Sequence, residues 1–546
     1  MTDGPVTALA TPVGPSLARA AVAIGAVTVA ARLVGFARGL VLVRTVGAGC
    51  VGDTYYAANA VPNIVFEVVA GGALASVVVP LLAGPVQAGD AATVTRIASA
   101  LLTWATALLV PVTLAGIVLA RPVMGLLAGP SLAAYDRAGV LWLGSRLLVV
   151  FMPQAVLYGA GIVLTGVLQA HRRFLGPAVA PLLSSLVVIG AYLAFAVEGG
   201  SAGTGCAGLS TGRLLTLALG TTAGVAMLSL SLLVPLRATG VRLRPSLAFP
   251  PGVAPRARAL ALAGVAALSA QQLATALVLR LSYGGPAGTL VLYNLAWALF
   301  LLPWAVLAVP IATSAFPRLS ARADAGDPAG FARDAAATTR AVVLVTAAAT
   351  AALVAAAPAV ARLLVLHAEG HPDPAALARA VAVLAPGLIG YGLVAHLGRA
   401  LYARHEGRRA AAATVTGWAV VAATDLVLVQ VVPHGHRLVV LAAGNTVGMT
   451  AAGALLALAI GRVTGGAALA GLRLTGPVAL AAAAVGGGCG LALAGALPGG
   501  GIGAALWQAG VAAGVGLAAF VAVTAALDRG SLHELARLVP AGRRHG

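Results

Sequence analysis

Arginine side chains occur in this chain at positions where the flanking sequence is apolar enough to lie inside a membrane. Arg32, Arg38 and Arg44 fall within one such stretch, residues 31–80. A charged group at the centre of a bilayer costs about 2.5–3.5 kcal/mol, so intramembrane charges usually face a protein interior or a water-filled cavity. Three guanidinium groups in one predicted helix therefore indicate a water-accessible chamber that binds something anionic.

The spacing of these arginines limits how the chamber can be built. Arg32 and Arg38 are six residues apart, so they point about 120° apart on a straight helix of about 3.6 residues per turn. They face one chamber only if it is wide or if the helix bends, and Gly35 is a residue that permits a bend. Arg44 lies near the outer end of the helix, where its side chain can instead extend to the membrane surface.

Two acidic residues lie inside predicted spans, and each has two interpretations. Glu67 is either a structural partner of an arginine such as Arg32 or Arg38, or a gating group that changes its protonation. Asp425 either binds a coupling cation (Na+ or a proton) or forms a hydrogen bond with a neighbouring hydroxyl such as that of Thr424. Residue type and spacing leave both choices open.

Further polar residues join these as candidates. Asp53 lies in the loop after the first predicted span, and Arg280 lies at the outer end of the seventh, where it faces the other half only if the two halves pack together. Asn294 is placed in the eighth span beside aromatic residues. The predicted substrate-binding residues are Arg32, Arg38, Asp53, Asn63, Glu67, Arg280 and Asn294, and the predicted hinge or packing positions are Gly35, Gly71 and Gly72.

Composition identifies the class of protein. The chain has 546 residues, of which 60% are hydrophobic and 9% are charged, and its mean hydropathy is +0.99. Soluble proteins carry about 25% charged residues, so this composition is that of a polytopic membrane protein. The formal charge of +19 comes from arginines scattered through short loops. This distribution sets orientation in a membrane, and nucleic-acid binding is not expected.

Hydropathy predicts an all-α protein with fourteen membrane spans, since a span needs about 20 mostly apolar residues. Arginines concentrate in the loops that share a side with the N-terminus, which predicts a plasma-membrane protein with both termini in the cytoplasm. The predicted spans are residues 20–46, 56–83, 97–120, 138–167, 176–197, 213–236, 258–282, 288–315, 339–362, 376–402, 410–432, 437–460, 474–497 and 501–526.

Short internal repeats divide the chain into two halves. The sequence ALASVVVPLLA at 73–83 is echoed by IATSAFPRLSA at 311–321, and VLQAHRRF at 167–174 is echoed by ALYARHEG at 400–407. An offset of about 233–237 residues contains an even number of spans and therefore predicts two parallel six-helix lobes. The predicted parts are an N-terminal tail 1–19, an N-lobe 20–240, a linker 241–257, a C-lobe 258–460, two extra helices 474–526 and a C-terminal tail 527–546.

The sequence does not indicate an enzyme. The 15 acidic residues are dispersed, so no carboxylate cluster for metal or acid–base catalysis is evident. There is neither a GxxxxGK[ST] phosphate loop nor an HExxH pair, so no ATPase motor and no cofactor is expected. His434 and His436 share one predicted outer loop, where solvation is favoured over a metal site. Cys50, Cys206 and Cys489 are far apart and form no CxxC pair, so neither a zinc site nor a disulfide is expected.

Five stretches, in order along the chain, resemble the MurJ/MviN family of lipid II flippases within a larger exporter superfamily. Together they cover about residues 20 to 460, and it is their order and spacing that carries the resemblance. The stretches are ARLVGFARGLVLVRTVGAGCVGDTYYAANAVPN (31–63), GGALASVVVP (71–80), GVLQAHRRFLGPAVAPLL (166–183), LFLLPWAVLAVPIATSAFPRLSARADAGD (299–327) and ALYARHEGRR (400–409).

The resemblance implies fourteen helices, two lobes arranged in a V, and a central cationic cavity lined by the first, second, seventh and eighth helices. It also implies that the last two helices form a groove for a lipid tail. The implied substrate is an undecaprenyl-diphosphate-linked disaccharide-peptide, which suits arginines because guanidinium binds diphosphate in a bidentate manner. By position, Arg32, Arg38 and Asp53 match functionally prominent charges of the family.

This chain departs from the family pattern at several positions where other members carry charge. The predicted chamber is therefore less cationic than is usual, and sodium coupling through Asp425 is left open. The substituted positions are Phe66 and Glu67 (paired arginines in many members), Gly71 (an acid), Trp297 and Ala298 (an Asp-Arg pair) and Val278 (near an acid of a proposed cation site).

The expected function is translocation of a lipid-linked anionic glycan from the inner to the outer leaflet by alternating access, driven by membrane potential or an ion gradient. One alternative is a flippase of the same fold for another lipid-linked oligosaccharide. A second is a cell-wall assembly scaffold that transports nothing. The expected partners are the substrate, the bilayer and cell-wall synthesis proteins, and the expected oligomeric state is a monomer.

Overall fold

The computed structural model describes residues 15–130, 132–201, 205–251, 253–366, 368–497 and 501–538. Within these ranges the protein is helical and contains no strand, which confirms the predicted all-α class. By length and composition, twelve helices can cross a membrane, or thirteen if the pair bent by 43° at residues 385–386 is one span. The remaining predicted span, 56–83, which is the second along the chain, coincides with helices α2, η1 and α3, so the count of fourteen stays a prediction.

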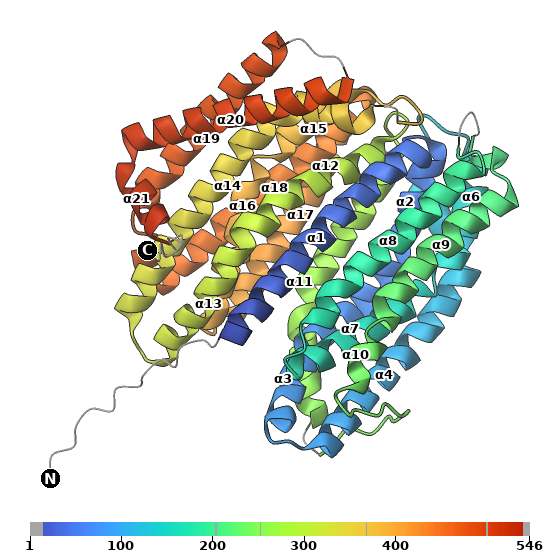
Figure 1. Ribbon diagram of the computed structural model, residues 1–546, viewed down its shortest axis with the longest axis horizontal. Helices are drawn as coiled ribbons and strands as arrows, with labels where there is room; N and C mark the ends of the chain where they lie inside the picture. Colours follow the sequence, from blue (N-terminus) through green and yellow to red (C-terminus); the bar gives the residue numbers. More distant parts are fainter. Residues whose placement is uncertain are drawn as a thin grey trace.

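The N-lobe is the group of blue to green helices on one side of Figure 1. Its helix α1 starts at Pro15, so the last residues of the predicted tail 1–19 are helical, whereas residues 1–14 lie outside the described part. The helices of this lobe are α1 (Pro15–Thr45), α2 (Cys50–Phe66), η1 (Glu67–Gly71), α3 (Gly72–Gln87), α4 (Ala91–Val118), α5 (Ala120–Ala128), α6 (Arg137–Phe151), α7 (Gln154–Ala170), α8 (Leu175–Val197), η2 (Cys206–Gly208), α9 (Thr211–Leu230) and α10 (Leu233–Arg237).

The C-lobe lies beside the N-lobe and diverges from it toward the end where α3 and α13 lie (Figure 1). Its helix α11 starts within the predicted linker 241–257. The helices of this lobe are α11 (Val253–Ser282), α12 (Thr289–Pro303), η3 (Trp304–Ala308), α13 (Val309–Asp324), α14 (Pro328–Val365), α15 (Pro374–Leu384), α16 (Gly387–Ala403), α17 (Gly407–Val431), η4 (His434–His436) and α18 (Arg437–Val463).

Two irregularities recur at the predicted repeat offset. The π-helical turns η1 and η3 begin at residues 67 and 304, which are 237 residues apart. The breaks between α6 and α7 and between α15 and α16 are each followed by a helix start, at residues 154 and 387, which are 233 residues apart. Since π-turns are rare and tend to occur at functional sites, their recurrence supports an internal duplication of the lobes.

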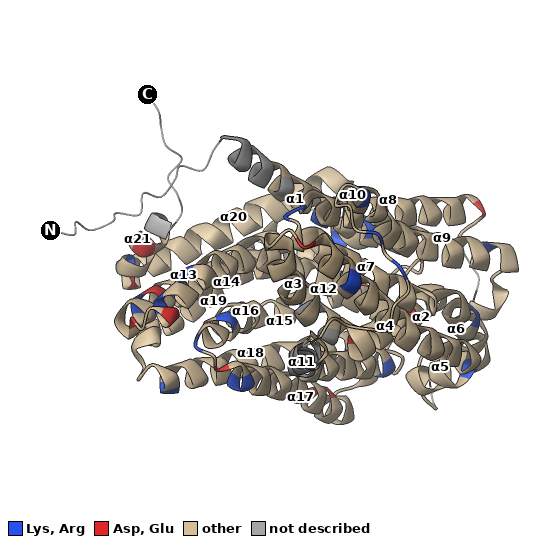
Figure 2. Ribbon diagram, turned by 90° about the horizontal axis from the view of Figure 1, so that it is seen from below, with Lys and Arg blue, Asp and Glu red and all other residues tan. Residues whose placement is uncertain are grey.

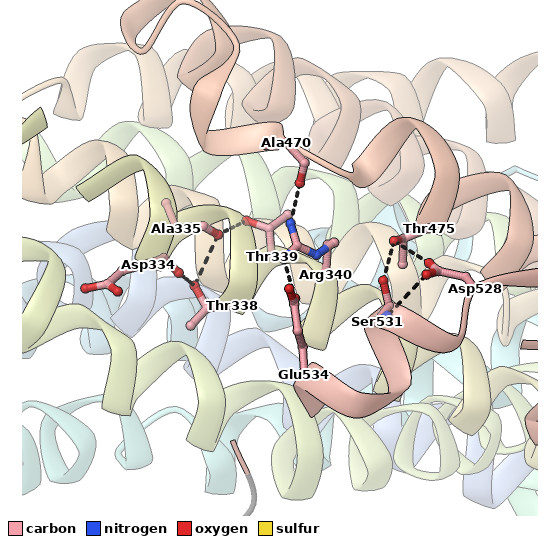
Figure 3. A network of polar contacts seen from close by, with 10 residues as sticks. All are labelled: Asp334, Ala335, Thr338, Thr339, Arg340, Ala470, Thr475, Asp528, Ser531 and Glu534. Atoms are coloured by element: carbon pink, nitrogen blue, oxygen red, sulfur yellow. Dashed lines mark hydrogen bonds and ion pairs between the residues drawn. The ribbon is translucent and has the colours of Figure 1, made fainter. Parts of the chain in front are cut away.

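The chain ends in η5 (Ala467–Leu469), α19 (Leu472–Ala496), α20 (Gly501–Leu527) and α21 (Arg529–Leu538). Glycine and alanine allow α19 and α20 to approach closely: a Cβ on Gly486 would lie 2.4 Å from the Gly516 carbonyl oxygen. Helix α21 lies in the predicted tail and was not expected from the sequence. It is anchored by an ion pair between Glu534 and Arg340 and by hydrogen bonds among Thr475, Asp528 and Ser531 (Figure 3).

Charged residues are sparse along the helices and occur mainly near helix ends and loops (Figure 2). Several helices start at an acidic residue whose carboxylate accepts a hydrogen bond from a backbone N–H of the first turn. Asp90, Asp136, Asp327 and Asp373 cap α4, α6, α14 and α15 in this way. These caps satisfy N–H groups that lack partners within the helix and so define where each helix begins.

A disulfide joins Cys50, at the start of α2, to Cys206 in η2, and the expectation that these cysteines remain unpaired was wrong. Reasoning from sequence spacing found only that they are 156 residues apart. The fold brings the loop after α1 against the loop between α8 and α9, so the two side chains meet. Cys489 is free and exposed.

Replacing both Cys50 and Cys206 with serine is expected to lower the apparent unfolding temperature of the purified protein by several degrees. A cross-link over a long loop restricts the unfolded chain and contributes about 2–4 kcal/mol of stability. Thermal unfolding in detergent measures the effect, and the exposed Cys489→Ser change is the matched control. An unfolding temperature equal to that of the control would contradict a stabilising role for the cross-link.

Candidate functional site

A cavity of about 330 Å³ lies between the lobes, and Arg38 of α1 is the only charged residue in its wall among the residues that the structure describes. We call it the central cavity. Helices α1, α2, α7, α8 and α9 of the N-lobe supply most of the wall, and α12 closes the C-lobe side. The lining residues are Gly35, Phe36, Arg38, Gly39, Tyr55, Tyr56, Asn59, Tyr158, Ser184, Val188, Tyr192, Thr221, Val225, Leu228, Asn294, Leu295, Trp297, Ala298 and Leu301.

A larger cavity of about 680 Å³, which we call the vestibule, continues the central cavity toward the start of α1. Arg32 and Arg38 both line the vestibule, and Arg38 lines both cavities. Helix α1 is unbroken through Gly35, and the two arginines line the same wide hollow. The residues that line both cavities are Gly35, Phe36, Arg38, Ser184, Leu228, Ala298 and Leu301.

Tyrosines surround Arg38 in the central cavity. The hydroxyl of Tyr55 lies 2.7 Å from that of Tyr192 and 3.0 Å from that of Thr221, so these groups hold one another in place. Within the part of the chain that the structure describes, no carboxylate forms an ion pair with Arg38. The guanidinium group therefore has its charge available for a ligand, and the hydroxyls of Tyr56 and Tyr158, which also line the cavity, can donate hydrogen bonds to the same ligand.

The hollow is shut at one end by contacts between the lobes, and Asp53 is at their centre. Its buried carboxylate accepts hydrogen bonds from the backbone N–H groups of Gly288 (3.1 Å) and Val291 (2.9 Å) and from the hydroxyl of Tyr135 (2.9 Å). Gly288 and Val291 begin α12, so Asp53 of the N-lobe caps a helix of the C-lobe.

Backbone contacts surround this cap. The N–H of Ala48 donates to the carbonyl of Glu369 (2.8 Å), and the N–H of Ala133 donates to the carbonyl of Tyr283 (3.3 Å). Gly288 has φ +79°, and a Cβ there would lie 2.6 Å from the Ala48 carbonyl oxygen, so only glycine fits. We call this region, residues 47–53, 129–130, 132–136, 280–291 and 368–371, the closed end.

The other predicted site residues occupy different places. Arg280 is at the closed end, where its guanidinium group lies against Gly129, and it lines neither the central cavity nor the vestibule. Asn63 is exposed and Glu67 half-buried, and neither lines these cavities. Asn294 lines the central cavity and donates a hydrogen bond to the Leu290 carbonyl (2.9 Å).

Glu67 begins the π-turn η1, and among the described residues it forms no ion pair with Arg32 or Arg38. Its carboxylate instead lies over Gly71, where a Cβ would be 2.5 Å from the nearer oxygen. Gly71 ends the π-turn and Gly72 begins α3, so both predicted hinge positions adjoin an irregular segment of helix. Their role as hinges stays a prediction.

Asp425 is fully buried in α17, and neither carboxylate oxygen has a hydrogen-bond partner among the described residues. Thr424 does not bond it. The side-chain oxygen of Asn445 in α18 is also buried and unpaired, and Asn445 lines a cavity of about 140 Å³ within the C-lobe together with Tyr293 and Asn294. Buried unpaired oxygens are costly unless a proton or a cation satisfies them.

Sequence reasoning missed the tyrosines and Asn59 of the central cavity. Tyr55 and Tyr56 follow the candidate Asp53 by two and three residues, at the start of the predicted cavity-lining span that contains Asn59, so their position was a usable signal. Tyr158 and Tyr192 come from the fourth and fifth predicted spans, which the family resemblance does not place at the cavity. Only the packing of α7 and α8 against α1 and α2 reveals them.

Comparisons with known proteins agree with this architecture. The family model "Lipid II flippase MurJ" matches residues 42–501. A curated relative from Rhizobium tropici, "Probable lipid II flippase MurJ", is 29% identical over 177 residues, which are 32% of this chain and 33% of the relative. The matched part thus spans about a third of that relative's length.

Solved structures show the same fold at low sequence identity. The structure "Lipid II flippase MurJ, inward closed conformation" has a TM-score of 0.72 and 13% identity, covering 93% of this chain and 99% of the other. An inward-facing multidrug resistance MATE transporter of the MOP superfamily has a TM-score of 0.64 and 14% identity, covering 81% and 96%. A MOP superfamily transporter from Pyrococcus furiosus has a TM-score of 0.56 and 15% identity, covering 82% and 96%.

The fold, the arginine-lined hollow between two related lobes and the family model all support one family assignment. Because that model matches most of the chain, the protein belongs to the lipid II flippase MurJ family.

Proposed function

We propose that this protein moves lipid II, a diphosphate-linked glycan lipid, from the inner to the outer leaflet by alternating access. The observation that carries the proposal is that Arg32 and Arg38 line one hollow between two lobes, which is shut at one end. Two guanidinium groups on one wall match a diphosphate, which offers several anionic oxygens in a row. Vestibule and central cavity together provide the space for a headgroup.

The proposed orientation places the closed end outside and both termini in the cytoplasm. Arginines are concentrated in loops on the N-terminal side, as expected for the cytoplasmic face. The Cys50–Cys206 disulfide joins segments on the side of the closed end, and disulfides form in oxidising compartments outside the cytosol. Both observations support the same orientation, so the vestibule would open toward the inner leaflet.

In the proposed cycle, a headgroup enters the vestibule, its diphosphate binds Arg32 and then Arg38, and the lobes rock until the closed end opens. Opening requires the hydrogen bonds of Asp53 to α12 to break. An anion that moves outward across an inside-negative membrane gains up to about 2.3 kcal/mol per charge per 100 mV. The membrane potential can therefore provide direction without ATP.

We further propose that Asp425 binds the coupling cation, either Na+ or a proton. Replacing Asp425 with asparagine removes the charge at nearly unchanged volume. We expect the stimulation of translocation by an imposed Na+ or proton gradient to disappear, whereas transport driven by potential alone changes less than about twofold. Translocation in proteoliposomes, with each gradient imposed separately, measures this stimulation. Thr424→Ala, at the neighbouring position, is the matched control. A gradient response that survives in Asp425→Asn would exclude the role.

The function itself is tested in vesicles that contain the purified protein and one defined lipid. Translocation of lipid II, with its rate increased by an imposed potential, is the expected result. A second candidate is a flippase for another lipid-linked oligosaccharide. It is favoured by the departures of this chain from the family pattern, such as Trp297 and Ala298 at the positions where the resemblance implies an Asp-Arg pair. Transport of such a lipid but not of lipid II would support this second candidate. If neither lipid is transported, the result would favour a cell-wall assembly scaffold that transports nothing.

A further inference from the structure

We propose that the α12 wall of the central cavity, together with Asn59 of α2, forms a carbohydrate subsite, in which Trp297, Asn294 and Asn59 hold a sugar ring of the substrate while Arg38 and Arg32 hold its diphosphate. The inference rests on the proposed function and deepens it, because it assigns the two chemical parts of the headgroup to two walls. None of these three residues carries charge.

The aromatic part of the wall is rigid. Trp297 lines the central cavity, and its ring lies nearly parallel to those of Tyr293 (9°, centroids 6.5 Å apart) and Phe300 (18°, 5.1 Å). Tyr391 contacts it at 6.0 Å with an interplanar angle of 68°. Aromatic side chains held in this way offer apolar contact area at little entropic cost. The C–H face of a sugar ring is apolar and matches such a surface.

The two asparagines of the subsite, Asn59 of α2 and Asn294 of α12, have hydrogen-bonding capacity that the described part of the protein does not use. The side-chain oxygen of Asn59 is buried, borders the central cavity and has no partner among the described residues. Asn294 uses one amide hydrogen for the Leu290 carbonyl and keeps its side-chain oxygen for other partners. Amides can accept from and donate to the same hydroxyl-rich ligand, so two of them beside an aromatic ring suit a sugar.

Charge and size separate the two parts of the headgroup. Within the described part of the chain, Arg38 on α1 is the only charged group that lines the central cavity. The diphosphate therefore belongs on the α1 wall, and the α12 wall is left for a neutral group. The central cavity, at about 330 Å³, is at the small end of the range for ligand sites, about 300–1,000 Å³. It suits a single sugar ring, and the rest of the headgroup would occupy the vestibule.

Binding to three lipids tests the subsite: undecaprenyl diphosphate without sugar, the same lipid with one N-acetylated sugar, and lipid II. The full-length protein in detergent is expected to bind both glycosylated lipids about three- to tenfold more tightly than the sugar-free lipid. Trp297→Ala should remove this preference and leave the affinity for the sugar-free lipid unchanged, whereas Trp297→Phe should keep most of it. Asn59→Ala should also reduce the preference for the glycosylated lipids.

Trp304→Phe is the matched control, because Trp304 packs on the same Tyr391 ring but does not line the central cavity. Equal weakening of all three lipids by Trp297→Ala would overturn the subsite, as would a wild-type protein that binds them equally. Equal binding of the three lipids by the wild-type protein would leave the proposed function intact. The diphosphate site is tested by a different result: it would be excluded if Arg38→Ala bound the sugar-free lipid as tightly as the wild-type protein does.

Discussion

Replacing Arg38 with alanine is expected to lower the translocation of lipid-linked diphosphate about 10- to 100-fold. Arg38 lines both the central cavity and the vestibule and has no carboxylate partner among the described residues, so its charge is available to the substrate. A hydrogen bond to a charged group contributes about 1.5–3 kcal/mol, which corresponds to this loss. Translocation in proteoliposomes at a fixed imposed potential measures it, and rescue of a strain depleted of its flippase gives a cellular readout.

Two further variants separate geometry from charge. Arg38→Lys keeps the charge but loses the planar guanidinium, so it should recover only part of the rate. Arg96→Ala is the matched control, because Arg96 is an exposed arginine at the start of α4 whose hydrogen bond goes to Thr93. Transport by Arg38→Ala at the rate of the Arg96→Ala control would refute the assignment of Arg38 to the diphosphate.

Replacing Asp53 with alanine is expected to shift the protein toward an outward-open state by about tenfold or more. The carboxylate accepts two hydrogen bonds from the start of α12, which join α2 to that helix, and a third from the Tyr135 hydroxyl. Each bond to a charged group contributes about 1.5–3 kcal/mol. Once the carboxylate is lost, the freed N–H groups of Gly288 and Val291 are better satisfied by water, which reaches them when the lobes separate. The closed end is then the less stable arrangement.

Labelling of a cysteine in the central cavity reports this shift. In a Cys489→Ser background, Ser184→Cys places a thiol in the wall, and a membrane-impermeant maleimide is added from outside. The labelling rate should rise about tenfold in Asp53→Ala. Tyr135→Phe removes one of the three bonds to the carboxylate, together with the bond that the Tyr135 hydroxyl accepts from the Gly288 N–H (2.7 Å), and should give a smaller rise. A labelling rate that is unchanged in both variants would show that Asp53 does not hold the closed end shut.

The membrane class, the helical fold and the importance of α1 follow from the sequence because they depend on local properties. Hydropathy over about 20 residues identifies spans, and an arginine in such a stretch must find water or a partner. The repeat offset was also readable, and the π-turns at residues 67 and 304 recur at that distance. Arg32, Arg38 and Asp53 therefore entered as candidates from sequence alone.

Pairings between distant segments were decided only by the tertiary structure. Asp53 meets Val291 across 238 residues, and Cys50 meets Cys206 across 156. No local pattern encodes such distances, because they arise from how whole helices pack. The same packing brings Arg32 and Arg38 to one wide hollow, turns Arg280 toward Gly129 and places Trp297 opposite the tyrosines around Arg38. Sequence determined which groups must avoid lipid, and the packing of the lobes determined what each of them faces.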